Sequence, residues 1–172
     1  MLKKYNLNRK EYNTIVKTLS GRLFGYCVKY LQSKPDADDI VQDVFEKLWN
    51  NRKKVDFEKS KSWLFTTAHN TMLNYIKRRN RISYVDEVSS DDTQVCQIHQ
   101  FELKEIINHS LEILPPVQKS IILLRDLEGY DYKEIGEILE LSESQVKVYL
   151  FRARNKMKKR LKNLNMLEVK HA

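Results

Sequence analysis

The stretch that decides the fold runs from Asp131 to Lys162 and reads DYKEIGEILELSESQVKVYLFRARNKMKKRLK. It holds two helix-start patterns, Asp131 with Glu134 and Ser142 with Gln145, in which paired side chains satisfy free backbone N–H groups. A short turn separates the two predicted helices. Two capped helices joined in this way are typical of a helix-turn-helix, whose second helix enters the major groove of DNA.

The second predicted helix has one apolar stripe and one polar, cationic face. Spaced at three and four residues, the stripe consists of Val146, Leu150, Ala153, Met157 and Leu161. The opposite face consists of Ser144, Lys147, Val148, Phe151, Arg152 and Asn155. Eight Lys or Arg and no acid lie between Lys147 and Lys162. An isolated basic helix is usually a solvated surface, but this density of like charge on the second of two capped helices favours a polyanion as partner.

The turn between these helices departs from the usual sequence. Glu140 occupies the position that often holds Gly, and a left-handed backbone there costs about 1–2 kcal/mol in any other residue. We therefore expect a looser or differently shaped turn.

Composition narrows the class of protein. A chain of 172 residues with 41% hydrophobic content forms one large or two small domains. The net charge of +8 favours an anionic partner, either nucleic acid or an anionic membrane surface. The sequence lacks a membrane-length apolar run and a signal-peptide core, so we expect a cytoplasmic protein without membrane insertion. Cys27 and Cys96 are too few for a zinc site, and Cys27 falls in an apolar helical pattern typical of a core.

The periodicity is helical almost throughout and predicts an all-α fold of two small domains. The first spans residues 5–81 and the second residues 104–165. Between them, residues 82–103 contain five acids and no Lys or Arg, which indicates a flexible acidic linker.

In the first domain, Pro35 ends one helix and Asp36 is predicted to begin another. One face of that second helix is apolar (Ala37, Ile40, Val41, Val44, Phe45 and Leu48), and the other carries Asp39, Gln42, Asp43 and Glu46. An acidic face is usually only a solvated face. Trp49 falls on the polar side, however, and a large aromatic on such a surface is a frequent mark of a protein interface. We interpret this helix as a docking surface.

The next helix, residues 62–81, combines an apolar side with aromatic, amide and cationic groups. The apolar side is Leu64, Phe65, Ala68, Met72, Tyr75 and Ile76, and the candidate binding groups are Trp63, Asn70, Asn74, Lys77, Arg78 and Arg81. Such groups suit melted DNA, where bases stack and expose their edges. For Trp63 alone the favoured interpretation is a core residue. His69 has no second ligand at metal spacing and is interpreted as structural.

These stretches resemble the extracytoplasmic-function group of bacterial RNA polymerase sigma factors. The resemblance rests on DADDIVQDVFEKLW, WLFTTAHNTMLNYIKRR and LPPVQKSIILLRDLEGYDYKEIGEILELSESQVKVYLFRARNKMKKRL, in the family's order and spacing. It implies two helical domains, called regions two and four, with no domain between them. It also implies core RNA polymerase and promoter DNA as partners and makes an anti-sigma factor an expected one.

The resemblance implies a role for each surface. The acidic helix, with Asp39, Gln42, Asp43, Glu46 and Trp49, would dock on the polymerase. The segment from Lys53 to Arg81 would recognise and open the −10 promoter element. The predicted −35 contacts are Ser144, Lys147, Val148, Phe151, Arg152, Arg154 and Lys158. Gly136 stands where the family often has Ala. The geometry of the turn is therefore where this sequence departs from the family pattern.

Three other classes have less support in the sequence. A helix-turn-helix regulator that is not a sigma subunit usually carries an α/β receiver or ligand domain, and no such alternation is present. An enzyme would need a nucleophile–base–acid set, a glycine-rich phosphate loop or a metal cluster, and we expect neither catalysis nor a cofactor. A protein-interaction bundle leaves the two basic helices unexplained.

Overall fold

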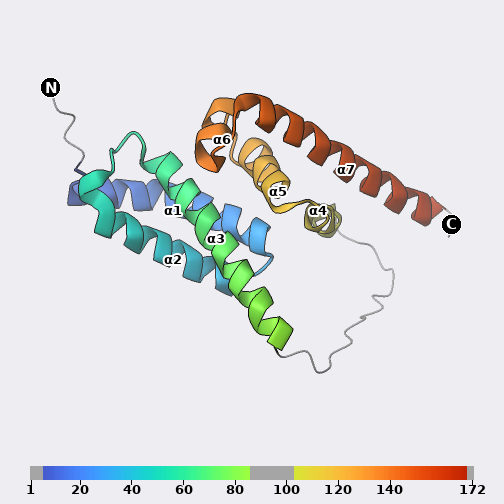
Figure 1. Ribbon diagram of the computed structural model, residues 1–172, viewed down its shortest axis with the longest axis horizontal. Coiled ribbons are helices and arrows are strands. Elements are labelled where there is room, and N and C mark those ends of the chain that lie inside the picture. The colour runs from blue at the N-terminus through green and yellow to red at the C-terminus, as the bar shows by residue number, and fades with distance from the viewer. Residues whose placement is uncertain (1–5, 86–102, 170–172) are drawn as a thin grey trace.

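The computed structural model of the chain describes residues 6–85 and 103–169 (Figure 1). In this part of the chain every regular element is a helix, which confirms the predicted all-α class. The first group comprises α1 (Arg9–Leu31), α2 (Lys34–Asn51), the short 3-10 turn η1 (Arg52–Lys54) and α3 (Ser60–Val85). The second comprises α4 (Leu103–Glu112), α5 (Pro116–Ile122), the π-helical turn η2 (Leu123–Leu127), α6 (Tyr132–Leu139) and α7 (Glu143–Val169).

Local side chains set the boundaries of α1 and α2. Asn8 and Glu11 form a reciprocal capping box at the start of α1. Gln32 ends that helix in a left-handed conformation with φ 56°. Ser33 then caps α2, so the helix begins at Lys34 and not at Asp36 as predicted. Pro35 lies in the first turn, where its missing N–H costs no hydrogen bond.

The apolar faces predicted for the first group form its core. Ala37, Ile40, Val44, Phe45 and Leu48 of α2 are buried. So are Leu64, Phe65, Ala68 and Met72 of α3. The predicted Val41, Tyr75 and Ile76 are half-buried at the edge of this core. Cys27 is fully buried as expected, and burial raises the pKa of its thiol to about 12.

In the second group, α5 and α7 pack against each other and α6 packs on α7. Val146, Leu150 and Ala153 of the predicted stripe are buried. Met157 and Leu161, farther along α7, are half-buried. The stripe therefore holds the helix against α5 and α6 and leaves the opposite face to solvent.

The two groups share one continuous hydrophobic core. α3 packs on α6 and α1 packs on η2, and Figure 1 shows the second group lying along the first with α6 beside α3. Three rings join them: the ring centroids of Tyr26 and Phe65 are 5.5 Å apart, and those of Phe65 and Tyr130 are 5.2 Å apart. Tyr26 and Tyr130 are almost fully buried.

A buried polar cluster crosses the same boundary. Ser120 Oγ of α5 lies 2.9 Å from His69 Nδ1 of α3 and accepts a hydrogen bond of 3.3 Å from the Tyr26 hydroxyl of α1. Burial lowers the pKa of His69 to about 4, so the imidazole is neutral near pH 7. The structural role predicted for His69 is confirmed. At the edge of the boundary, Arg22 pairs with Glu128 at 2.8 Å.

The predicted domain limits fall close to helix ends. α3 continues to Val85, four residues beyond the predicted end of the first domain, and α4 begins at Leu103, one residue before the predicted start of the second. Most of the predicted linker, residues 86–102, and residue 5 lie outside the described residues, as does Cys96.

Candidate functional site

Both capping boxes of the predicted helix-turn-helix are present. The Asp131 and Glu134 pair closes with hydrogen bonds of 2.9 and 2.8 Å, and the Ser142 and Gln145 pair with bonds of 2.9 and 3.2 Å. The predicted looser turn is wrong. Glu140 adopts the left-handed conformation at φ 57°, and the turn is closed by a 2.9 Å hydrogen bond from the Leu141 N–H to the Gly136 carbonyl.

A close backbone approach explains why residue 136 is a glycine. A Cβ atom at Gly136 would lie 2.5 Å from the carbonyl oxygen of Leu141. This separation is far below van der Waals contact, and the neighbour is backbone that cannot rotate away. The absence of a side chain therefore lets the turn close tightly over the end of α6.

The predicted outward face of α7 is exposed along its whole length. Ser144, Lys147, Val148, Phe151, Arg152 and Asn155 all lie on the surface. Phe151 is 67% exposed and Val148 46% exposed. Apolar side chains this open, flanked by cations, suit contact with base edges such as the methyl group of thymine.

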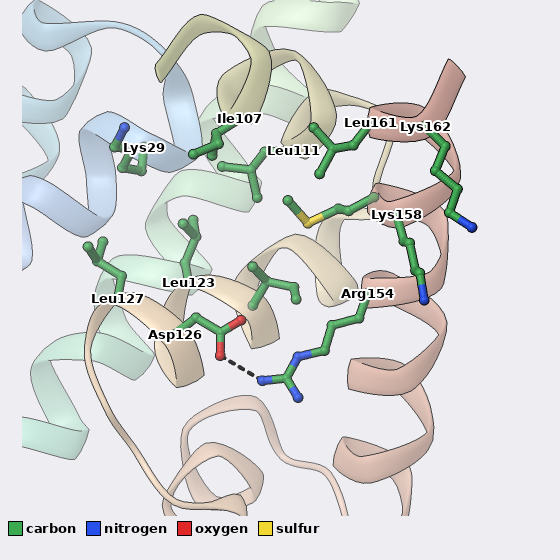
Figure 2. A pocket seen from close by; sticks show the side chains of 12 residues that line it. Lys29, Ile107, Leu111, Leu123, Asp126, Leu127, Arg154, Lys158, Leu161 and Lys162 are labelled. Atoms are coloured by element: carbon green, nitrogen blue, oxygen red, sulfur yellow. Dashed lines mark hydrogen bonds and ion pairs between the residues drawn. The ribbon is translucent and has the colours of Figure 1, made fainter. Parts of the chain in front are cut away.

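Arg154 and Lys158 face a different neighbourhood. The Arg154 guanidinium donates to the Asp126 carboxylate at 2.8 Å. Both residues border an apolar hollow of about 620 Å³ between α1, α4, η2 and α7. Figure 2 shows the Arg154–Asp126 pair at its edge, with Ile107, Leu111, Leu123 and Leu161 pointing inward. The structure thus separates these two predicted −35 contacts from Phe151 and Arg152.

The acidic face predicted for α2 is also open. Asp39, Gln42 and Glu46 are exposed. Asp43 is half-exposed and accepts a 2.6 Å hydrogen bond from Lys47, which also donates to Thr71 of α3. Three of the four predicted polar groups are therefore free of ion pairs among the described residues.

Trp49 is more covered than the prediction of a projecting ring implies. Its ring packs edge-on against Tyr12 of α1 with centroids 4.9 Å apart. The Arg52 guanidinium lies over the same ring, 4.2 Å from its centroid. Trp49 is half-buried, so only part of its ring is available to a partner.

The predicted −10 groups of α3 divide into two kinds. Trp63 is half-buried and packs against the core, as favoured for this residue. The remaining five are exposed at helical spacing along one face: Asn70, Asn74, Lys77, Arg78 and Arg81. These side chains form an amide-rich stretch that becomes cationic toward the end of the helix.

Among the described residues, no group of three or more His, Cys, Asp or Glu side chains is arranged to hold a metal ion. The helices of residues 6–85 and 103–169 include none with the length and apolar content to cross a bilayer.

Sequence reasoning missed the contacts between the two groups of helices. His69 and Ser120 are 51 positions apart, and Arg22 and Glu128 are 106 apart. Neither pair has a local pattern that distinguishes it from an ordinary surface or core residue. Contacts between residues this far apart in the sequence can be identified only from the tertiary structure.

Comparison with known proteins agrees with this architecture. The family described as Sigma-70 region 2 matches residues 15–82, and the family described as Sigma-70, region 4 matches residues 104–157. The ECF RNA polymerase sigma factor SigM of Bacillus subtilis is 27% identical over 145 residues, covering 79% of this chain and 86% of that protein. The ECF RNA polymerase sigma-E factor of Haemophilus influenzae is 26% identical over 172 residues, covering 91% and 90%.

Two solved structures share the fold. The sigma factor RpoE of Bartonella quintana, in complex with the anti-sigma factor NepR, has a TM-score of 0.74 at 22% identity and covers 89% of this chain and 98% of that one. CnrH in complex with the cytosolic domain of CnrY has a TM-score of 0.69 at 21% identity and covers 91% and 90%.

Fold and surfaces define a two-part, all-helical protein with a helix-turn-helix in its second half. The chain belongs to the extracytoplasmic-function family of bacterial RNA polymerase sigma factors. It is a transcription initiation factor that directs RNA polymerase to promoters, and the helix-turn-helix regulator of another kind is not favoured.

Proposed function

We propose that three exposed surfaces divide the work of initiation: α2 docks on core polymerase, α3 engages the −10 element and α7 reads the −35 element. The observation that carries the proposal is Phe151, two-thirds exposed on the outward face of α7 among cations. Keeping a large apolar ring in water is unfavourable, and contact with bases in a major groove removes it from water.

On α7, the proposed base-reading and adjoining contacts are Ser144, Lys147, Val148, Phe151 and Arg152. Lys147 is 4.0 Å from Glu143, an exposed pair that contributes little and that phosphate contact readily replaces. These residues occupy successive turns from the capped start of the helix, which is the end that usually meets base edges.

For docking, α2 offers negative charge in a protein whose net charge is +8. Asp39, Gln42 and Glu46 have no ion pair within the described residues, so a cationic partner displaces only water. The exposed part of Trp49 adds apolar contact beside them. Opposite charge across such an interface fixes orientation and speeds association.

For the −10 element, the amide groups of Asn70 and Asn74 are the proposed contacts to exposed base edges, since an amide both donates and accepts. Lys77, Arg78 and Arg81 are the proposed phosphate contacts. Trp63 packs on the core, and we propose that it holds the start of α3 in place without stacking on a base.

The family and the relatives' complexes support two further points. RpoE and CnrH were solved with NepR and with the cytosolic domain of CnrY, and we propose that an anti-sigma protein likewise binds this chain. We also propose that the chain acts in the cytoplasm beside RNA polymerase and has no catalytic activity of its own.

The docking assignment is tested by Glu46→Lys, titrated against core polymerase. Like charges opposed at an interface cost several kcal/mol, so the dissociation constant should rise by tenfold or more. Glu105→Lys is the matched control, because Glu105 is an exposed acid on α4 and its replacement changes the net charge equally. Equal affinities of the two variants for core polymerase would show that α2 is not part of the interface. The function as a whole is tested separately, by promoter-dependent transcription with core polymerase and the wild-type chain.

The −10 assignment is tested by Asn74→Ala in permanganate footprinting of the melted promoter. Reactivity should fall more than closed-complex binding, because edge contacts form only once bases are exposed. Asn80→Ala is the control, since this exposed asparagine lies on the same helix about 120° around its axis from Asn74. Full reactivity in Asn74→Ala would contradict the assignment.

A further inference from the structure

His69 lies at the boundary between the two groups of helices, and the side chains around it come from both groups. From α1, the Tyr26 hydroxyl lies 3.5 Å from its Nδ1 atom, and the Tyr30 ring stands nearly perpendicular to the imidazole with ring centroids 6.2 Å apart. From α5, Ser120 Oγ lies 2.9 Å from the same nitrogen. Ser120 belongs to the second group, so separation of the groups removes this hydrogen bond and opens that side of the imidazole to water.

The hydrogen bonds of this cluster fit a neutral imidazole. The Tyr26 hydroxyl donates to Ser120 Oγ at 3.3 Å, and the Ser120 hydroxyl can in turn donate to an unprotonated Nδ1. An imidazolium carries a proton on both ring nitrogens and accepts no hydrogen bond. Protonation therefore turns the Nδ1 acceptor into a donor that faces the Ser120 hydroxyl, and the direction of the hydrogen bonds has to reverse.

Protonation also places a positive charge in the boundary without an acid to balance it. Among the described residues, none forms an ion pair with His69. On α5, the Lys119 ammonium lies 5.2 Å from the Tyr30 ring centroid and adds a second cation on this side. Glu128, the acid at the edge of the boundary, is already paired with Arg22. The acids of α2 and α6 are exposed or bound elsewhere, and the bound ones are Asp36 to Arg79, Asp43 to Lys47 and Glu134 to the Asp131 N–H.

The proton therefore binds the separated form more tightly than the packed form. Burial lowers the pKa of His69 to about 4 in the packed chain, whereas a histidine in water has a pKa of about 6.5. Between these values, each fall of one pH unit raises the ratio of separated to packed chains by up to about tenfold.

We propose that the boundary is a proton-sensitive latch, in which protonation of the His69 imidazole separates the two groups of helices and leaves each group folded. Each group keeps a packed pair of its own, α2 on α3 in the first and α5 on α7 in the second. A buried histidine that is neutral in one arrangement and charged in the other is a means by which proteins respond to pH. The latch is a property of the boundary itself and does not depend on which surface contacts DNA.

The test follows the full-length chain from about pH 7.5 to about pH 4. Three quantities are measured in parallel: the imidazole resonances of His69, the radius of gyration from X-ray scattering and the helical content from circular dichroism. The radius of gyration should rise by roughly a quarter as His69 takes up its proton, because the two groups then move as separate bodies, and the helical content should stay constant. His69→Gln takes up no proton at this position and should stay packed.

Three outcomes would overturn the proposal. The wild-type chain could remain packed with His69 protonated, which would show that the boundary tolerates the charge. His69→Gln could expand as much as the wild type, which would assign the expansion to other groups. Helical content could fall together with the expansion, which would show unfolding of the groups in place of their separation.

Glu128→Ala distinguishes the latch from a direct electrostatic effect on His69. The substitution breaks the ion pair with Arg22 at the edge of the boundary. Loss of an acid acts directly to lower the pH at which a histidine titrates, whereas a weakened boundary raises that pH, by about half a unit for a partly exposed pair. Glu137→Ala is the matched control, because Glu137 is an exposed acid of α6, and it should leave the titration of His69 unchanged. A lower or unchanged titration pH in Glu128→Ala would contradict the latch.

Discussion

Replacing Ser120 by alanine tests whether the two groups of helices behave as one folded unit. Ser120 is fully buried on α5, and its hydroxyl lies 2.9 Å from His69 Nδ1 and 3.3 Å from the Tyr26 hydroxyl. Alanine removes the shared partner of both groups, which stay buried and 3.5 Å from each other. Leaving a buried polar group unsatisfied costs about 1–3 kcal/mol, and we expect a loss of stability in that range.

The two tryptophans allow unfolding of the first group of helices to be followed separately from unfolding of all the helices. Trp49 and Trp63 both lie in the first group of helices, so fluorescence reports on that group while circular dichroism reports on all helices. In urea unfolding of Ser120→Ala, both midpoints should shift together, although the substitution lies in the second group. Thermal midpoints should fall by about 2–4 °C for each kcal/mol lost.

Ser110→Ala is the matched control. Ser110 is also fully buried, but its hydroxyl donates to the Ile106 carbonyl of its own helix at 2.8 Å. That carbonyl keeps its helical hydrogen bond when the hydroxyl is removed, so the expected change is within about 0.5 kcal/mol. A fluorescence midpoint that stays in place in Ser120→Ala while dichroism shifts, or equal losses in the two variants, would refute the reasoning.

Three further predictions concern the stability of the full-length chain. Gly136→Ala should lower the thermal midpoint by the equivalent of about 1–3 kcal/mol, because the new Cβ meets the Leu141 carbonyl oxygen at 2.5 Å; an unchanged midpoint would contradict this close approach. Glu140→Gly should raise the free energy of unfolding by about 0.5–1 kcal/mol, since relief of the left-handed backbone outweighs the added chain entropy of glycine, and a destabilised variant would refute that balance. Because the pKa of His69 is about 4 in the folded chain and about 6.5 unfolded, the unfolded state binds more protons between these values. Stability is therefore complete above pH 6.5 and falls by at most roughly 3 kcal/mol toward pH 4; urea unfolding should show a flatter pH profile in His69→Gln than in the wild type, and the idea fails if the two profiles coincide.

The features that were predictable from the sequence are local and periodic. Capping boxes join residues three positions apart, and apolar stripes repeat every three or four positions, so the helix-turn-helix and the faces of α2 and α3 follow from the sequence. The exposed position of Phe151 was predicted in the same way. These patterns place Asn70, Asn74, Val148 and Phe151 on the exposed side of their helices.

The features that were not predictable depend on a neighbour distant in sequence. Arg154 and Arg152 are alike in sequence, and only the position of Asp126 distinguishes their surroundings. Trp49 was expected to project, but Tyr12 of another helix covers part of its ring. At Glu140 the cost of a left-handed backbone was taken to exclude that conformation, whereas the hydrogen bond and packing of the closed turn outweigh it.

Because the two groups of helices share a core, promoter binding is coupled to the separation of these groups. The −10 and −35 elements are separated by about 25 base pairs, or roughly 85 Å of B-DNA at ~3.4 Å per base pair. In the packed arrangement α6 contacts both α3 and α7, and a helix is only about 10–12 Å across. If α3 and α7 contact the two elements as proposed, they reach both only after the boundary at Tyr26, Phe65 and Tyr130 separates. Any ligand that binds the separated form alone has its apparent affinity reduced by the fraction of chains in that form. If polymerase and DNA both prefer the separated form, each raises the affinity of the chain for the other by the same factor.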